Sequence, residues 1–186
     1  MPVITVTLLP GYPTDVEHRL VDRLARAAGS VIAAPPAGTT VFVSHASTYQ
    51  RDGRVFDGGA AARPVATDLV LGFLDAMQRR DLDAAQRFLA PDFSMCFPGG
   101  VRMSRLEELV ERARGRYRAV AKDYETVDEC WTGSGTVVYC FGTLRGTWND
   151  GRSFSGIRFI DRFEVVDGSI RRQDVWNDLA EAAAAR

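Results

Sequence analysis

The chain has too few cysteines and histidines to build a disulfide framework or a metal site. Its 186 residues include 3 cysteines and 2 histidines. Cys96, Cys130 and Cys140 are widely spaced and have apolar neighbours, which favours reduced core thiols over disulfides. With only His18 and His45 available, no zinc pattern can be assembled. We therefore expect no metal, and nothing in the sequence implies an organic cofactor.

The chain also lacks an excess of charge and a long apolar run. Its formal net charge is −1, which provides none of the positive field that nucleic-acid binding uses. No stretch approaches about 18 uninterrupted apolar residues, and the N-terminus has no positive segment followed by an apolar one. A hydrophobic fraction of 46% is ordinary for a globular protein. We therefore expect a cytoplasmic protein that binds neither nucleic acid nor membrane.

The first segment, residues 1–59, has the pattern of a β-α-β unit followed by a hairpin. Residues 2–9 alternate like a half-buried strand, and residues 14–17 (TDVE) have the spacing of a helix capping box. An apolar stripe then recurs at three- and four-residue intervals until Pro35-Pro36 ends the helix. Residues 39–44 predict a second strand, parallel to the first. So small a unit buries little surface, and we expect it to need partner subunits.

A linker of small residues, 60–64, precedes a second segment, 65–186. Apolar stripes and a second capping box at 104–107 (SRLE) predict three helices in its first half. Four strands are then predicted, at 124–132, 135–148, 152–166 and 169–177. The turns NDG and DG separate the last three of them, as in hairpins. The whole chain is therefore predicted to be α+β, with three helices against a curved antiparallel sheet in the second domain.

Pro2 directly follows the initiator methionine, whose removal would free its secondary amine. A free α-amino group titrates near pH ~8, and burial or nearby cations lower that value, so the amine could be a base at neutral pH. The segment also has a turn at 11–13, one amphipathic helix, an Ala34-Pro35 pair and a closing aromatic-x-Gly-Gly at 56–59. With these features residues 2–59 resemble a 4-oxalocrotonate tautomerase subunit. The resemblance implies that Pro2 shuttles a proton on a small enol or ketone.

In tautomerases of this family, arginines bind the carboxylates of the substrate. Here Tyr12 and Thr40 stand at the two positions that the family usually gives to arginine. The resemblance implies that substrate would instead meet the polar, cationic and aromatic residues Tyr12, His45, Arg51, Arg54 and Phe56. The alternative for the two arginines is a solvated loop pair. Either the substrate is not a dicarboxylate, or the segment is kept for assembly.

Four stretches of the second segment carry another resemblance: residues 73–83, 88–93, 161–170 and 176–178. Through them residues 65–181 are similar to the nuclear transport factor 2-like superfamily. Ketosteroid isomerases and SnoaL-like polyketide cyclases share its cone-shaped fold. This resemblance implies a fold and a cavity rather than one activity, because the scaffold hosts enzymes, binders and assembly domains.

The aspartic acid that serves as oxyanion donor in ketosteroid isomerases falls on Asp161. Its same-face strand neighbours are all apolar: Ile157, Phe159, Phe163 and Val165. A carboxyl group in such surroundings has a raised pKa and can stay protonated as a hydrogen-bond donor. The alternative is a structural carboxylate paired to Arg158, Arg172 or a water. The phenol and general-base positions of that family are Phe73 and Phe97 here.

Aromatic side chains of the second segment are candidates for the wall of its cavity. They are Tyr117, Tyr139, Trp148 and Trp176. We predict Tyr117 and Trp176 as substrate-binding residues, with core packing as the alternative for each aromatic.

Three functions from different classes fit the sequence. The preferred one is an isomerase of the tautomerase type with Pro2 as general base. The second is a SnoaL-like cyclase, isomerase or dehydratase that uses the cavity of the second domain, with the first segment serving assembly. The third is a binding protein for small molecules. All three imply a small-molecule ligand, and we expect a homo-oligomer, a hexamer or a dimer.

Overall fold

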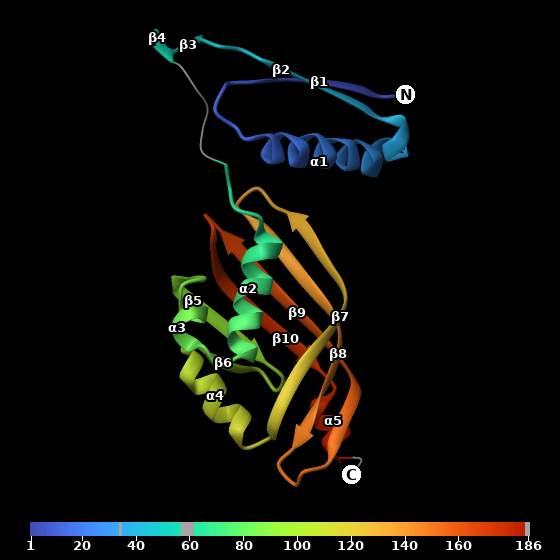
Figure 1. Cartoon of the computed structure of the whole chain (residues 1–186), viewed down its shortest axis with the longest axis vertical. Helices are drawn as coiled ribbons and strands as arrows, with labels where there is room; N and C mark the ends of the chain where they lie inside the picture. The colour runs from blue at the N-terminus through green and yellow to red at the C-terminus, as the bar shows by residue number, and fades with distance from the viewer. Residues whose placement is uncertain (34, 57–61, 185–186) are drawn as a thin grey trace. The chain divides into compact units, whose positions relative to one another are not determined.

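The computed structural model describes residues 1–33, 35–56 and 62–184, which divide into two compact units, Met1–Ala62 and Arg63–Arg186 (Figure 1). Three of the sequence predictions fall on residues outside the described ones: Ala34, the closing residues 57–59 of the first segment, and residues 60–61 of the linker. Among the described residues, no helix is long and apolar enough to cross a membrane. Each unit is considered by itself below.

The first unit is a β-α-β arrangement with a small hairpin. Strand β1 (Val3–Leu8), helix α1 (Thr14–Ile32) and strand β2 (Thr40–His45) follow one another, with a 3-10 turn at Pro36–Gly38. Strands β1 and β2 are parallel, and α1 runs along one side of them (Figure 1). Strands β3 (Tyr49–Arg51) and β4 (Arg54–Phe56) form the hairpin. The predicted order of elements is therefore present.

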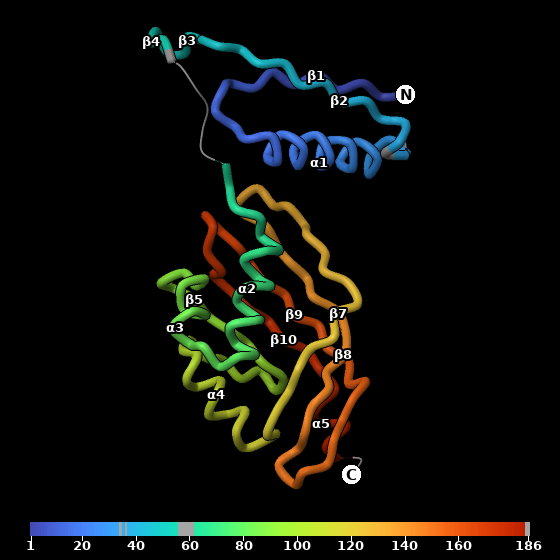
Figure 2. The backbone as a smooth tube through the Cα atoms, in the orientation of Figure 1, coloured from blue at the N-terminus to red at the C-terminus, as the bar shows by residue number. Residues whose placement is uncertain are grey.

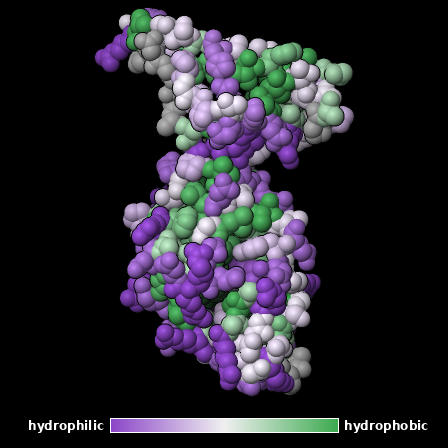
Figure 3. All heavy atoms as spheres, viewed as in Figure 1, coloured by the Kyte–Doolittle hydropathy of each residue, from purple (hydrophilic) through white to green (hydrophobic). Residues whose placement is uncertain are grey.

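None of the described residues of this unit is fully buried. The apolar Val3 and Phe42 are 63% and 56% exposed. On the face shown in Figure 3, hydrophobic residues gather on the strand side of this unit and hydrophilic ones along α1. Such a sheet face is typical of a unit that is completed by another surface, but the expected oligomer stays a prediction.

The second unit contains a six-stranded sheet. Its strands are β5 (Leu89–Phe97), β6 (Val101–Met103), β7 (Tyr117–Trp131), β8 (Thr136–Trp148), β9 (Ser153–Val166) and β10 (Ser169–Asn177). The sheet order is β6-β5-β10-β9-β8-β7, so the last four strands form the predicted antiparallel meander. Strand β5 lies parallel to β10 and carries β6 at the edge. The sequence analysis did not predict these two strands.

The helices of the second unit are α2 (Ala66–Gln78), α3 (Leu82–Gln86), α4 (Leu106–Arg114) and α5 (Leu179–Ala184). The first three were predicted, but α4 ends sooner than expected, at Gly115, so Tyr117 lies on β7 and not on a helix. Neither predicted capping box supplies its cap: the N-cap residues are Pro13 for α1 and Arg105 for α4, without a side-chain hydrogen bond. At the start of α4, Nε of Arg105 donates instead to Glu108 at 2.8 Å.

The sheet of the second unit curls around α2, as the tube view shows (Figure 2). Bulges in β7 and β8 interrupt the regular pairing and increase the bend. Gly142 and Gly146 stand where β7 passes closest to β8, because a Cβ on either would collide with a backbone oxygen of β7. The concave face thus packs on the helices, with the core residues Phe73 and Phe163 in edge-to-face contact at 6.0 Å.

Candidate functional site

The concave side of the second unit holds a cavity of about 360 Å³. This volume lies in the range of small-molecule sites, and most of the lining is apolar. The wall comes from α2, α4, α5, the long strands β7 to β10 and Phe97 of β5. Its polar and charged lining residues are Gln78, Arg80, Arg118, Lys122, Asp161, Gln173 and Asn177. A mostly apolar cavity with few polar groups suits a hydrophobic ligand with a few polar atoms.

Asp161 is the fully buried carboxylate of this cavity. Its exposed fraction is 0%, and its Oδ2 accepts a hydrogen bond from Nζ of Lys122. The Lys122 ammonium also lies 4.7 Å from the centre of the Phe159 ring, within the range of a cation–π contact. Lys122 and Asp161 thus form an ion pair on the wall of the cavity.

Strand alternation and sheet curvature explain why Asp161 and Lys122 meet. Along β9, Asp161 shares its inward face with Phe159 and Phe163, as predicted. Lys122 pairs with Leu144 on β8, whereas Asp161 pairs with Cys140, four residues away along the same strand. The long lysine side chain covers this offset across the concave face. Asp161 is therefore paired with a residue that the sequence analysis did not name.

The other expected partners of Asp161 are engaged elsewhere. Arg158 donates to Asp178 at 2.7 Å, and Arg172 donates to Asp174 at 3.0 Å. The alternative that paired Asp161 with one of these two arginines is therefore wrong. The lysine lies on a strand that was predicted to start only at residue 124, so its position facing the cavity was not visible in the sequence.

Two buried polar atoms of the cavity wall have no hydrogen-bond partner among the described residues. They are Oδ1 of Asp161 and Oε1 of Gln173. Gln173 is 3% exposed and lies on β10, two residues from Val175, which is directly opposite Asp161. The two side chains are thus diagonal neighbours on one face. Because a buried polar group without a partner costs about 1–3 kcal/mol, such atoms indicate where a ligand's polar groups would bind.

Burial also controls the titration of the groups around Asp161. Burial raises the pKa of Cys140 to about 12, and the negative charge of Asp161 adds to this effect. Burial raises the pKa of Tyr124 as well, again with contributions from Cys140 and Asp161. Both groups therefore stay protonated at neutral pH, and Tyr124 presents a phenol that can donate to a ligand in the cavity.

The aromatic candidates of the second unit separate into three groups. Tyr117 lines the cavity, where the sequence analysis expected it. Trp148 is 5% exposed and packs in the core against Phe154, with ring centres 4.4 Å apart. Trp176 is 53% exposed and does not line this cavity. The prediction of Trp176 as a wall residue does not hold here, because Val175 points inward and its strand neighbour points to the other face.

In the first unit, the candidate residues do not come together. Pro2 precedes the start of β1, and its carbonyl accepts a hydrogen bond from Thr40 at 3.1 Å. His45 ends β2 and lies 2.7 Å from Glu17. Because His45 pairs with Leu8, six residues after Pro2 at about 3.3 Å per residue, Pro2 lies about 20 Å from His45 along the strands.

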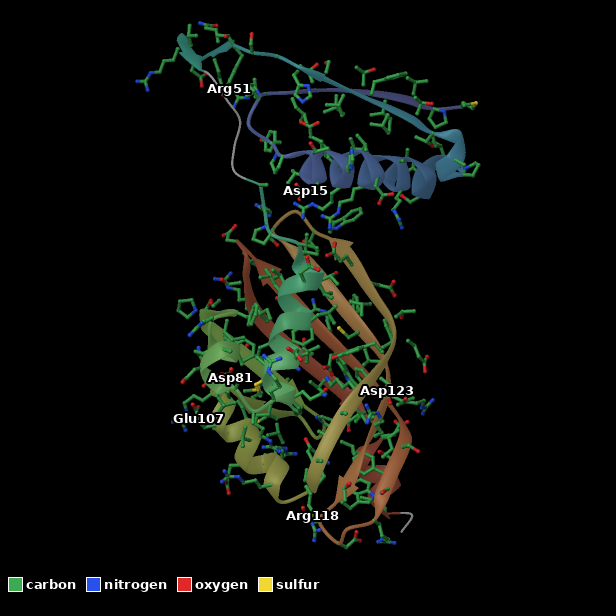
Figure 4. The ribbon with its side chains drawn as sticks, viewed as in Figure 1. Asp15, Arg51, Asp81, Glu107, Arg118 and Asp123 are labelled. Carbon is green, nitrogen blue, oxygen red and sulfur yellow. The ribbon has the colours of Figure 1, made fainter. Side chains whose placement is uncertain are left out.

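The remaining candidates of the first unit follow the His45 end. Tyr12 lies in the turn after β1, and Arg51 pairs with Arg54 across the β3–β4 hairpin. The Arg51 guanidinium lies 5.9 Å from the centre of the Tyr49 ring, and Figure 4 shows Arg51 at the end of the unit away from the N-terminus. Phe56 closes β4. One copy of this unit therefore does not assemble a site from Pro2 and the two arginines.

Neither unit offers a recognisable metal centre within its described residues. No group of three or more His, Cys, Asp or Glu side chains is arranged to hold an ion there.

Known proteins are similar to the second unit. Residues 70–173 match the family model described as a SnoaL-like domain, more than half of the chain. No curated protein matches. The predicted similarity to this superfamily is confirmed for these residues. The match to the family model starts at residue 70, so it does not include the first unit.

Three solved structures illustrate the similarity. An NTF2-like protein of unknown function from Burkholderia pseudomallei is 21% identical, with 63% of this chain and 94% of that chain covered and a TM-score of 0.53. A putative polyketide cyclase from Xanthomonas campestris is 23% identical, with 64% and 94% covered and a TM-score of 0.52. TerC, co-crystallised with polyporic acid, is 15% identical, with 63% and 95% covered and a TM-score of 0.53. These likenesses support a common fold.

Proposed function

Because the chain belongs to the SnoaL-like domain family, we propose that its second unit binds a hydrophobic, carbonyl-bearing small molecule and moves a proton on it, as an isomerase or cyclase. The observation that carries the proposal is Asp161, a fully buried carboxylate in an apolar cavity. Lys122 binds one of its oxygens, and the other has no partner in the described part of the chain. Oδ1 of Asp161 can therefore bind a ligand in the cavity.

Asp161 is the general base of the proposed reaction. Its free oxygen, Oδ1, accepts a proton from the carbon next to the substrate carbonyl, and the C–H electron pair moves into an enolate. The protonated Asp161 then returns the proton to another carbon, which is isomerisation. In a cyclisation the enolate carbon attacks a second carbonyl of the same substrate, and the new alkoxide takes the proton. Both sequences leave the enzyme unchanged.

Lys122 and Tyr124 have supporting roles. Lys122 holds Oδ2 of Asp161 in an ion pair, which leaves Oδ1 as the oxygen that takes the proton. Tyr124 lines the cavity as a neutral phenol and is a candidate donor to the developing enolate oxygen. Phe73 and Phe97, which replace the acid and base positions of ketosteroid isomerases, contribute apolar wall. We thus propose Asp161 as a base, in place of the protonated donor that the sequence resemblance implied.

Exchange of carbon-bound hydrogen with deuterium tests the proposal without the natural substrate. We expect the wild-type protein to accelerate exchange of the protons next to the carbonyl of 2-tetralone in D₂O, followed by NMR. Asp161→Asn keeps the shape of the side chain and removes the base, so exchange should fall about 10²–10⁴-fold. Exchange that is unaffected by Asp161→Asn would refute the assignment. Binding of 2-tetralone without exchange by the wild type would favour a binding protein.

The tautomerase hypothesis for Pro2 has weaker support. It rests on the sequence resemblance of residues 2–59, and Pro2 lies at the opposite end of its strand pair from His45, Arg51 and Arg54. We therefore propose assembly as the role of the first unit.

A further inference from the structure

We propose that the cavity selects ligands that carry an acidic group, and that Arg80 and Arg118 bind this group at the cavity wall. This inference rests on the proposed function in one respect: the ligand is the molecule that Asp161 faces. It adds a substrate class, namely apolar carboxylic acids or ionised enols with a hydroxyl at their other end.

The charges along the cavity wall support this choice. Three cationic side chains line it, Arg80, Arg118 and Lys122, while Asp161 is the one carboxylate among its described lining residues. Asp161 neutralises Lys122, which leaves the two arginines in excess. The whole chain has a net charge of −1, so this positive excess is local.

Neither arginine has an ion pair within the described parts of the chain, although several neighbours do. Arg79, next to Arg80 on the chain, is paired with Asp75, and Arg114, near Arg118, is paired with Glu111. Both Arg80 and Arg118 are exposed, as expected for residues at an opening. Their guanidinium groups are thus available to a carboxylate, which they can bind with two parallel hydrogen bonds.

The backbone at Arg80 is a second, independent observation. Arg80 follows the end of α2 with a φ of 60°, in the left-handed region. Its N–H donates to the carbonyl of Met77 and that of Asp81 donates to the carbonyl of Ala76, which is the Schellman arrangement. Glycine is the usual residue at this position because it has no Cβ to strain. The left-handed conformation fixes the direction in which the Arg80 side chain leaves the end of the helix.

The surroundings of the two arginines point to the cavity. Burial raises the pKa of Tyr117, and the positive charges of Arg116 and Arg80 act in the opposite direction, so the charge of Arg80 reaches the phenol of a lining residue. Arg118 lies in the bulge of β7: Tyr117 pairs with Trp148 and Ala119 with the next residue, Thr147. Bulges re-aim side chains, and Figure 4 shows Arg118 at the start of β7.

The unpartnered buried atoms define the opposite end of the ligand. Oδ1 of Asp161 and Oε1 of Gln173 have no partner among the described residues, and both can accept a hydrogen bond from a ligand group such as a hydroxyl. Apolar side chains, including Leu144 and Phe159, line the space between. A flat apolar acid with a hydroxyl at the far end satisfies all three regions.

A matched pair of fluorescent probes tests the inference. We titrate the protein with 6-hydroxy-2-naphthoic acid and with its methyl ester, which differ mainly in charge. We expect the wild type to bind the acid about tenfold more tightly than the ester at low salt. The double variant Arg80→Gly, Arg118→Gln should lose this preference and bind the ester unchanged. High salt should weaken the preference of the wild type, because the arginines are exposed.

Two further variants keep the outcome interpretable. Arg79→Gln removes the same charge from a residue that does not line the cavity, so the preference should persist. Arg80→Gly relieves the left-handed strain, so its melting temperature should not fall, and a lost preference cannot be attributed to unfolding. Equal affinity for acid and ester, a preference that survives in the double variant, or no binding of the acid at millimolar concentration would overturn the inference.

The failure of this inference is distinguishable from failure of the proposed function. Acid preference without deuterium exchange would refute the proton-transfer role of Asp161 and leave the ligand class standing. Deuterium exchange without acid preference would refute the ligand class and leave the proton-transfer role of Asp161 standing.

Discussion

The two units of this chain place helices against sheets in both cases, yet they bury their residues very differently. The second unit has a core in which Phe163, Val138 and Ile170 are 0% exposed, and it also buries the charge of Asp161. In the first unit, none of the described residues is fully buried, and Phe42 is 56% exposed. A cavity with defined electrostatics needs the first kind of surroundings. The proposed function therefore belongs to the second unit, and assembly is the proposed role of the first.

The largest effect is expected from a substitution in the core of the second unit. Phe163→Ala should lower the free energy of unfolding by about 3–5 kcal/mol, because it removes a fully buried ring that packs on Phe73. Phe42→Ala in the first unit should change it by less than about 1 kcal/mol. Denaturant unfolding of both variants measures the contrast. Equal losses would mean that Phe42 is buried in an assembly, and would contradict the difference in burial between the two units.

The next effect concerns the buried charge pair. Lys122→Met should destabilise the protein by about 3–5 kcal/mol, because it leaves the Asp161 carboxylate buried without a partner. The double variant Lys122→Met, Asp161→Asn should recover part of this loss, since no buried charge remains. Stability of the single variant within about 0.5 kcal/mol of the wild type would contradict a buried ion pair.

A smaller effect, on pH dependence, follows from Cys140. Its pKa is raised to about 12 by burial, so the folded state favours the neutral thiol. The stability that the folded state gains from keeping the Cys140 thiol neutral is present below the ordinary thiol pKa of 9.0. It is lost as the pH rises toward 12. Cys140→Ser should remove that loss from the alkaline unfolding profile.

Alkylation gives a second measurement of the same group. With iodoacetamide at pH 8, the exposed Cys130 should react much faster than the buried Cys140, as peptide mass spectrometry can follow. Similar rates at the two thiols would show that the second unit opens easily around Asp161.

The smallest effect is expected at Pro2. We expect Pro2→Ala to leave deuterium exchange on 2-tetralone unchanged, since the cavity lies in the other unit. If the wild type also ketonises phenylenolpyruvate, the same variant separates the two units: loss of that activity, together with a mature N-terminus that starts at Pro2, would restore the tautomerase hypothesis. Retention would support assembly as the role of the first unit.

The sequence predicted those parts of the fold that depend on local signals. The hairpin turns near Asn149 and Asp167 and the alternation of β8 and β9 are local, and the meander was predicted from them. Strand β5 contains Pro91 and pairs in parallel with β10, about 80 residues further along the chain, so this pairing has no local signal. The hairpin of β5 with β6 is local, with a turn at Gly99-Gly100, and the sequence analysis missed that signal.

The candidate site followed the same pattern. Alternation along β9 was enough to place Asp161 among apolar residues on an inward face. Its partner Lys122 depends on where β7 starts and on the bend of the sheet, and the apolar stripe of the preceding helix obscured that start. The sequence did not predict the left-handed conformation of Arg80, because such a backbone at a helix end is recognised in a sequence only when the residue is glycine.

The most direct test of the account compares two aspartate variants in the same exchange assay. Asp161→Asn changes the buried carboxylate of the cavity, and Asp123→Asn makes the identical change at an exposed residue of β7 that is paired with Arg145. We expect deuterium exchange on 2-tetralone to fall at least about 100-fold in the first variant and to stay at the wild-type rate in the second. Equal rates in both variants would contradict the claim that this cavity is where the protein acts.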